Sequence, residues 1–495
     1  MRFTFPLKMS ITSSTKRTYQ DAVTALNSLQ SNYANIMAIR ASGDRKNMMN
    51  IWEMQEWSRR IGYSTKDYNK LNIIHITGTK GKGSTAAFTQ SILSQYNDRL
   101  TNIGLYTSPH LKSVRERIRI NGNPITEEKF SQYFFEVWDK LEATTSSEDK
   151  FPHMTPGSKP GYFKYLTLLS FHVFMQEGCD TCIYEVGVGG EFDSTNIIEQ
   201  PTACGVSLLG IDHTFMLGNT IEEIAWNKGG IFKRGSPAFT IANQPPKGLA
   251  VLKQRAEERE TTLTEVPIFE QLKHVKLGIA GDFQISNASL AVALANQHLV
   301  HLGISDGSVS LTESSTIPTK FISGLVSTKW EGRCQTIKEG SITWYIDGAH
   351  TKDSIEAASN WFKTTVNPLK NKKILLFNQQ TRDANTLLSQ LYKVVTPDVK
   401  FDRAIFSTNV TWKSGNYSAD LVSMNTSKEQ VDKLEVQKSL GEAWQMLSPE
   451  TQIDVVPSIE DACTLIRDYD EPLDVFVTGS LHLVGGLMVV FDGTS

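Results

Sequence analysis

Short apolar runs alternate with longer amphipathic stretches through the first three hundred residues. A helix is expected at residues 19–30, and β-branched runs predict strands at residues 73–77, 101–107, 181–187, 203–209 and 237–242. Strands separated by helices favour a parallel sheet with helices on both faces. The pattern therefore predicts an α/β fold that binds its ligands beyond the carboxyl ends of the strands.

A second series of apolar runs follows a change in composition. Residues 142–161 are rich in Ser, Thr, Pro and charge and predict a surface loop, whereas the Ser-, Thr- and Gly-rich residues 303–328 predict a linker. Strands are expected beyond it at residues 342–347, 373–378, 403–408, 452–456 and 474–479, and a helix at residues 431–447. We expect a tail at 1–17, a larger domain at 18–324 and a smaller α/β domain at 325–495.

A glycine-rich loop follows the first predicted strand. The sequence LNIIHITGTKGKGS at residues 71–84 leads directly into the helix-forming TAAFTQSILSQ. A strand, a tight turn and a helix in this order direct backbone N–H groups at an anion. The predicted phosphate-binding residues are Gly78, Thr79, Lys80, Gly81, Lys82, Gly83 and Ser84.

This loop differs from the general nucleotide-binding pattern. Two residues rather than four separate Gly78 from Gly81, and Gly83 occupies the usual hydroxyl position. The alternative interpretation is a basic surface turn before a helix.

Composition narrows the class of protein. The 495 residues are 40% hydrophobic, with 50 basic and 53 acidic residues and a formal charge of −3. This balance gives no electrostatic reason to expect nucleic acid as a partner. The five cysteines are too few for a disulfide framework, and the Cys179/Cys182 pair is expected to be buried in a strand rather than to bind metal.

The two ends of the chain carry features that bear on targeting and membrane insertion. Residues 473–491 contain Asp474, His482 and three glycines, so we expect no transmembrane segment. Residues 1–20 carry four basic residues and no acid, which suits either a mitochondrial leader or a short tail, with Met9 as an alternative start. We expect a cytoplasmic protein with a mitochondrial pool.

Several ordered motifs resemble the folylpolyglutamate synthase family of Mur-type amide ligases. They are GTKGKGS, TSPHL, RERIRING, EVGVGGEFDSTN, DHTFMLGNTIEEIAWNKGGIFK, WEGR and DGAHTKDS, and they span nearly the whole chain. The resemblance implies a P-loop-type domain, a Rossmann-like domain, and ATP held between them. It also implies γ-linked addition of L-glutamate to reduced folates through an acyl phosphate, by a monomer.

The resemblance also implies a set of functional residues. Magnesium would be held by Ser108, Glu185 and His213, with a monovalent cation as a further cofactor. Lys82 would contact the transferred phosphate, and Lys228 matches a lysine that the family often carries as a carbamate. Each of three residues also has an alternative role. Glu185 could cap the end of a strand, His213 could be a polar loop residue, and Lys228 could be an ordinary lysine at a helix C-terminus.

Three residues of the second domain match the family's nucleotide-contacting region. Arg333 suits bidentate phosphate recognition, and Asp347 belongs to the same group. His350 matches a histidine near the γ-phosphate or the incoming glutamate. Its alternative role is to cap the following helix, and that of Arg333 is to close a linker turn.

The folate site and the acceptor are less defined. Tyr162 and Phe163 are candidates for stacking on a folate ring, with a core role as the alternative, and Gln284 and Asn287 match a motif in which Phe283 replaces a common histidine. Lys80 resembles the polyglutamylating branch rather than dihydrofolate synthase. A muramyl ligase and a non-catalytic nucleotide switch are further alternatives.

Overall fold

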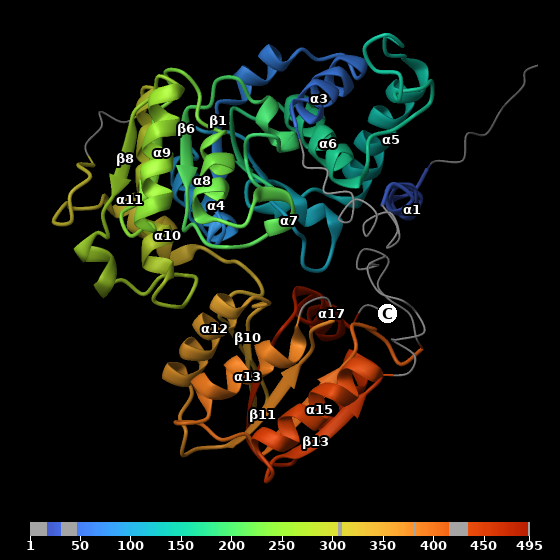
Figure 1. Ribbon diagram of the computed structural model, residues 1–495, viewed down its shortest axis with the longest axis vertical. Coiled ribbons are helices and arrows are strands. Elements are labelled where there is room, and N and C mark those ends of the chain that lie inside the picture. The colour runs from blue at the N-terminus through green and yellow to red at the C-terminus, as the bar shows by residue number, and fades with distance from the viewer. Residues whose placement is uncertain (1–16, 31–46, 305–308, 381–382, 415–433, 494–495) are drawn as a thin grey trace, which may run out of the picture.

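The computed structural model describes residues 17–30, 47–304, 309–380, 383–414 and 434–493. The basic segment considered as a leader, including Met9, lies almost entirely outside these residues. Within them, the eight-stranded sheet and its helices form the upper part of Figure 1, and the six-stranded sheet forms the lower part.

The larger sheet has the strand order β4-β3-β2-β5-β1-β6-β7-β8. Its strands are β1 (Ile73–Thr77), β2 (Ile103–Tyr106), β3 (Ile118–Ile120), β4 (Asn123–Pro124), β5 (Thr181–Glu185), β6 (Ala203–Val206), β7 (Ala238–Ile241) and β8 (Leu263–Val266). The strands from β2 to β8 in this order are parallel, as predicted, whereas β3 and β4 add an antiparallel edge.

The helices around this sheet occupy both of its faces. They are α1 (Tyr19–Asn27), α3 (Met48–Arg60), α4 (Lys82–Leu93), α5 (Glu127–Ala143), α6 (Tyr162–Gln176), α7 (Thr214–Leu217), α8 (Ile221–Gly229), α9 (Pro246–Glu258), α10 (Gln284–His301) and α11 (Thr319–Ser327). Short 3₁₀ turns are η1 (Thr65–Leu71), η2 (Ser94–Tyr96), η3 (Val114–Arg117), η4 (Ser194–Ile197) and η5 (Glu270–His274).

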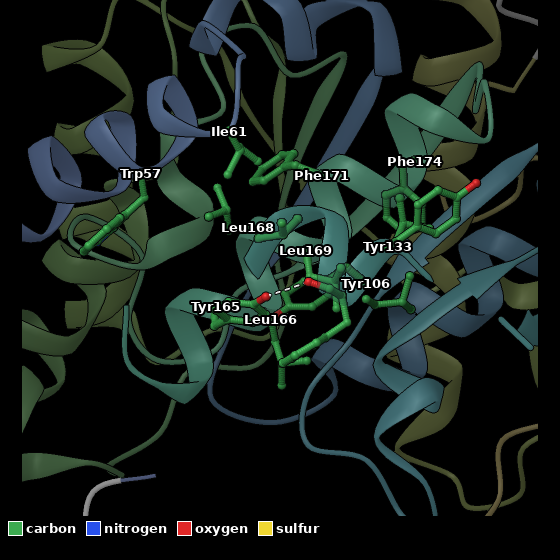
Figure 2. Close-up of a cluster of buried hydrophobic side chains, with 14 of the residues drawn as sticks. Trp57, Ile61, Tyr106, Tyr133, Tyr165, Leu166, Leu168, Leu169, Phe171 and Phe174 are labelled. Atoms are coloured by element: carbon green, nitrogen blue, oxygen red, sulfur yellow. Dashed lines mark hydrogen bonds between the residues drawn. The ribbon is translucent and has the colours of Figure 1, made fainter. Parts of the chain in front are cut away.

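Alternate residues of β1 serve the two faces of the sheet. Ile73 packs with α1, α3, α5 and α6, whereas Ile74 and Ile76 pack with α4, α10 and α11. Figure 2 shows the first of these cores, in which Trp57 and Ile61 lie near Leu168 and Phe171 of α6. The central strand is consequently buried throughout, which holds the loop that follows it in a fixed position.

The second sheet has the order β13-β12-β11-β14-β10-β9, with β9 antiparallel to β10. Its strands are β9 (Gln335–Glu339), β10 (Ile342–Ile346), β11 (Lys372–Phe377), β12 (Arg403–Ser407), β13 (Gln452–Val456) and β14 (Leu473–Thr478). Its helices are α12 (Lys352–Thr365), α13 (Ala384–Val395), α15 (Glu435–Leu447), α16 (Ile459–Arg467) and α17 (Leu481–Asp492).

Two sequence-based expectations need correction. The segment predicted as a linker contains α11, whose Phe321 and Leu325 are buried against α4 and α10. The sequence analysis also did not identify β3, β4, β8 and β9, because these strands are short and only partly buried. Short edge strands have too few apolar residues for a clear alternating pattern.

Cys179 and Cys182 are both buried free thiols, as expected. Cys182 lies in β5, whereas Cys179 precedes that strand. Among the helices of the described ranges, none is both long and apolar enough to span a bilayer.

Candidate active site

The glycine-rich loop lies at the carboxyl end of β1 and leads into α4. Gly78 has φ +149°, and Gly81, which caps α4, has φ +89°. A Cβ atom on Gly81 would lie 2.1 Å from Asn287 Oδ1, and one on Gly78 would lie 1.9 Å from Ser207 Oγ. The two glycines are therefore required both by backbone conformation and by close neighbours.

Hydrogen bonds attach this loop to the segment after β6. The N–H groups of Thr79 and Lys80 donate to the Leu208 carbonyl at 2.9 and 3.1 Å. Thr79 Oγ1 donates to the Gly210 carbonyl at 3.0 Å, and Ser207 Oγ donates to the Lys80 carbonyl at 2.7 Å. These bonds fix the loop at the N-terminus of α4 to residues 207–210.

Two lysines from distant parts of the chain converge on one carbonyl. Lys82 Nζ donates to the Gly78 carbonyl at 3.1 Å, and Lys228 Nζ donates to the same oxygen at 2.8 Å. Burial, and secondarily the charge of Lys82, hold the pKa of Lys228 well below its usual range. Lys228 lies in the last turn of α8, as the alternative interpretation expects, and it is 4% exposed.

Glu185 ends β5 beside this loop. Its Oε2 accepts a hydrogen bond from the Ser108 N–H at 2.9 Å, and its carboxylate lies within 4 Å of the position that a Gly83 Cβ would occupy. Burial raises the pKa of Glu185, and the positive charge of Lys82 opposes this rise. A buried carboxylate that contacts the backbone of Ser108 fits a hard cation with oxygen ligands such as Mg²⁺.

His213 occupies a different environment from Ser108 and Glu185. It has φ +51°, precedes the short helix α7, and is exposed. Its N–H donates to Asp212 Oδ1 at 2.8 Å. Across the described part of the chain, no three His, Cys, Asp or Glu side chains form a cluster that could hold a metal ion.

The second domain contributes a buried aspartate next to an arginine. Asp347 Oδ2 accepts from the Cys334 N–H at 2.8 Å, and Oδ1 accepts from the Ala349 N–H at 2.9 Å. Burial raises the pKa of Asp347, while the charge of Arg333 opposes that rise. Arg333 Nη1 lies 2.9 Å from the position of a Gly348 Cβ, so Arg333 and the DGAH segment are adjacent.

His350 follows this aspartate but does not cap the next helix. Its Nδ1 donates to the Gly348 carbonyl at 2.9 Å, and its N–H donates to Ser354 Oγ at 3.1 Å. The N-cap of α12 is Thr351, which forms a capping box with Ser354. The alternative role of His350, to cap the following helix, is therefore wrong, because Thr351 is the cap.

A direct contact joins the glycine-rich loop to the second domain. Lys80 Nζ donates to Thr351 Oγ1 at 2.6 Å and lies 3.6 Å from Asp212 Oδ2. The sequence analysis did not identify Thr351 or Asp212, although each stands next to a residue that it did select. A Thr followed three residues later by Ser, just before an apolar helix, was the available signal for Thr351.

The residues that match the modified glutamine motif also reach this loop. Gln284 Nε2 donates to Ser84 Oγ at 3.2 Å, and Asn287 Nδ2 donates to Gln284 Oε1 at 2.8 Å. Phe283, which replaces the histidine of the motif, is 43% exposed and packs near Gly281. Gln284 and Asn287 therefore support the loop whereas Phe283 faces away from it.

The two aromatic candidates for folate binding lie near the carboxyl end of β5. The ring of Phe163 fills the space beside Gly187, where a Cβ would approach Cζ to 2.3 Å. The Arg117 guanidinium lies 5.7 Å from the Tyr162 ring centroid. Both rings are only partly buried, and both contact the first core.

Two cavities adjoin this region. One lies between the domains and is lined by Thr107, His110, Arg119, Trp330, Arg333 and Leu481, among others. A larger cavity of about 430 Å³ lies between α7, α8 and α9 and includes Phe192, Met216 and Trp226. Its mostly apolar walls do not suit phosphate, whereas the interdomain cavity has two arginines.

Comparisons with known proteins agree with this two-domain arrangement. A family model described as dihydrofolate synthetase, C-terminal domain, matches residues 330–490. Folylpolyglutamate synthases of Saccharomyces cerevisiae strains FostersO and YJM789 are each 70% identical over 478 residues, covering 96% of this chain and 87% of each relative.

Solved structures share the fold at lower sequence identity. A Mycobacterium tuberculosis folylpolyglutamate synthase complexed with ADP and AMPPCP has a TM-score of 0.67 at 20% identity, over 95% of this chain and 99% of that one. An E. coli FolC in complex with DHPP and ADP has a TM-score of 0.66 at 22% identity, over 96% and 98%. The identity, coverage and fold together establish that this chain belongs to the folylpolyglutamate synthase family.

Proposed function

We propose that this protein is an ATP-dependent ligase that adds L-glutamate in γ-linkage to reduced folates and their polyglutamates. The observation that carries the proposal is the contact between Lys80 of the glycine-rich loop and Thr351, next to the DGAH segment. It brings two candidate nucleotide-binding regions, one from each domain, to the same cleft. The names of the close relatives support the same activity.

The first chemical step is transfer of the γ-phosphoryl group of ATP to the folate carboxylate. Both reactants are anions, so the site must concentrate positive charge. Lys82 contacts the transferred group in this proposal, and the N–H groups of residues 78–84 hold the phosphates. Arg333 and Asp347 contact the nucleotide from the other domain.

Ser108, Glu185 and His213 are the proposed ligands of Mg²⁺. When bound, Mg²⁺ supplies charge that lowers the repulsion between the γ-phosphate and the attacking carboxylate. The low pKa of Lys228 favours a neutral amine, the form that reacts with CO₂, which supports the proposed carbamate at this lysine. A monovalent cation is a further proposed cofactor.

The second step is attack of the glutamate amine on the acyl phosphate, with phosphate as the leaving group. No protein nucleophile is needed, because orientation of the amine supplies much of the rate enhancement. His350, whose Nδ1 is held by the Gly348 carbonyl, is proposed to face the γ-phosphate or the glutamate. Exclusion of water between the two domains would protect the intermediate.

Further proposals concern the whole protein. Tyr162 or Phe163 stacks on the folate ring, and the chain functions as a monomer divided near residue 325. It resides in the cytoplasm and, through residues 1–20, in mitochondria. Fusing those residues to a fluorescent reporter, with and without Met9, tests the last point, and a purely cytosolic signal from both fusions contradicts it.

The activity is tested with purified protein, MgATP, L-glutamate and either tetrahydrofolate monoglutamate or dihydropteroate. Product mass and ADP release are followed together. We expect glutamyl additions to tetrahydrofolate, and a turnover about 100- to 1000-fold slower in Lys82→Ala, the range seen when a preorganised donor is removed.

The same experiment separates the alternatives. Addition only to dihydropteroate would identify a dihydrofolate synthase, the activity named by the matching C-terminal family model. Nucleotide binding without either product, in folded protein, would indicate a nucleotide switch or a different acceptor.

A further inference from the structure

Residues 107–113 form a short arm between the two domains. The arm begins after β2 of the first domain, where the Thr107 N–H donates to the Arg117 carbonyl at 3.1 Å. One residue later, the Ser108 N–H donates to Glu185 Oε2 at 2.9 Å. The start of the arm therefore contacts the buried carboxylate of the candidate active site.

A single carboxylate binds the main chain of the last three residues of the arm. Glu116 accepts three main-chain hydrogen bonds of 2.9 Å, from the N–H groups of Leu111, Lys112 and Ser113. Three charge-assisted bonds to adjacent N–H groups leave little local freedom. Glu116 thus holds residues 111–113 together as one unit, and only Pro109 and His110 separate that unit from Ser108.

The far end of the arm is inserted into the second domain. Leu111 is 7% exposed and belongs to the hydrophobic core formed by β10, β11, β14, α16 and α17. A Cβ on Gly332 would lie 3.1 Å from Val484 Cγ1 and 3.2 Å from Leu111 Cδ2. Leu111 thus packs beside the backbone that carries Arg333, together with Val484 of α17.

Two ion pairs flank this insertion. Lys112 Nζ lies 3.1 Å from Glu331 Oε2 and 3.1 Å from Asp492 Oδ2. Lys112 is 24% exposed, whereas both acidic partners are 51% exposed, so these pairs add little stability beyond orientation. The apolar contact of Leu111 is the main attachment.

We propose that Leu111 is a positioning residue that ties the placement of Ser108 against Glu185 to docking of the second domain. Loss of the packing between Leu111 and the second domain loosens the hydrogen bond from Ser108 to Glu185. Leu111 itself touches none of the proposed substrates. The effect on catalysis rests on the proposed function. The coupling between Leu111 packing and the Ser108–Glu185 hydrogen bond does not.

The direct test is amide hydrogen exchange of the peptide containing Ser108 in ligand-free protein. We expect Leu111→Ala to speed exchange at Ser108, and Leu111→Met, which restores an apolar side chain, to return it toward the wild-type rate. In the ligase assay, Leu111→Ala should lower kcat about tenfold with less than about twofold change in KM for ATP, because misplacement affects the reacting geometry.

Leu465→Ala is the matched control. Leu465 lies in α16, is partly buried and packs against the same core. It should lower the melting temperature while leaving Ser108 exchange and kcat unchanged. If Leu465→Ala speeds Ser108 exchange as much as Leu111→Ala does, the effect is global loss of stability and the proposal is wrong.

Val484→Ala provides an independent test, because Val484 of α17 packs beside Gly332 together with Leu111. It applies even if Leu111→Ala fails to fold. We expect it to reproduce the faster Ser108 exchange. Wild-type exchange in a folded Leu111→Ala or Val484→Ala variant would overturn the coupling. Since exchange is measured without substrates, failure of the ligase assay alone would contradict the proposed function and leave the coupling intact.

Discussion

Buried histidines illustrate how single residues adapt to the packed sheet of the first domain. His298 of α10 bonds through Nδ1 to Thr202 Oγ1 at 2.7 Å and through Nε2 to Thr181 Oγ1 at 3.1 Å. Burial lowers its pKa to about 3, and burial lowers that of His75 in β1 to about 3 as well. Both rings are therefore neutral in the folded protein at neutral pH.

The low pKa of His298 in the folded protein predicts that the free energy of unfolding falls in acid. The unfolded state binds a proton near pH 6.5 that the folded state does not bind until about pH 3, so stability is complete above pH 6.5 and falls as the pH decreases. At pH 5, His298 alone should lower the free energy of unfolding by about 2 kcal/mol. Urea unfolding at pH 7 and pH 5 measures the change.

His298→Gln retains hydrogen-bonding groups but cannot be protonated in this range. Its loss of stability between pH 7 and pH 5 should be about 2 kcal/mol smaller than that of the wild type. His274→Gln, at an exposed position, is the control and should behave as the wild type. Equal pH dependence of His298→Gln and wild type would contradict the prediction.

At the scale of elements, the junction of β1 and α4 depends more on Gly81 than on Gly83. Gly81→Ala places a side chain at φ +89° and 2.1 Å from Asn287 Oδ1, so the loop or the Gln284–Asn287 pair must move. We expect it to lower the free energy of unfolding by about 1–3 kcal/mol and to weaken ATP binding. Urea denaturation and calorimetric ATP titration check both effects.

Gly83→Ala is the matched change within the same loop. Its Cβ would meet no atom closer than 3.6 Å, and the position is the second residue of α4, where Ala favours the helix. Its stability should stay within about 1 kcal/mol of the wild type. The interpretation fails if the two variants are equally destabilised.

For the whole molecule, the relation between the two domains depends on a few side chains that cross between separate sheets. Lys80 contributes its hydrogen bond to Thr351 and its ion pair with Asp212. Lys80→Met keeps the apolar stem and removes both contacts. We expect weaker ATP binding by about 1.5 kcal/mol, roughly tenfold in Kd, together with a larger radius of gyration in X-ray scattering.

Lys320→Met is the control for loss of a surface charge. Lys320 is 53% exposed and lies 3.7 Å from Asp98 within the first domain. Its ATP affinity and radius of gyration should match the wild type. Unchanged ATP affinity and scattering in Lys80→Met would show that this contact does not hold the domains together.

Most of the architecture could be predicted because the relevant signals are local. The central strands β1, β5, β11 and β14 fall where apolar runs predicted them, as does the loop that precedes α4. The antiparallel strands β3, β4 and β9 could not be predicted from the same pattern. β4 and β9 are edge strands and β3 is next to an edge, where partial burial allows polar residues and weakens the alternation.

The sequence by itself determined the order of helices and strands, the glycine turn, and the chemical types of the candidate residues, because each depends on neighbours along the chain. Only the tertiary structure decided that Lys228, 150 residues from Gly78, bonds to its carbonyl, and that Lys80 reaches Thr351 271 residues away. It also decided that Leu111 is buried in the other domain. Such contacts depend on which surfaces meet after the sheets have formed, and residue spacing along the chain does not specify that.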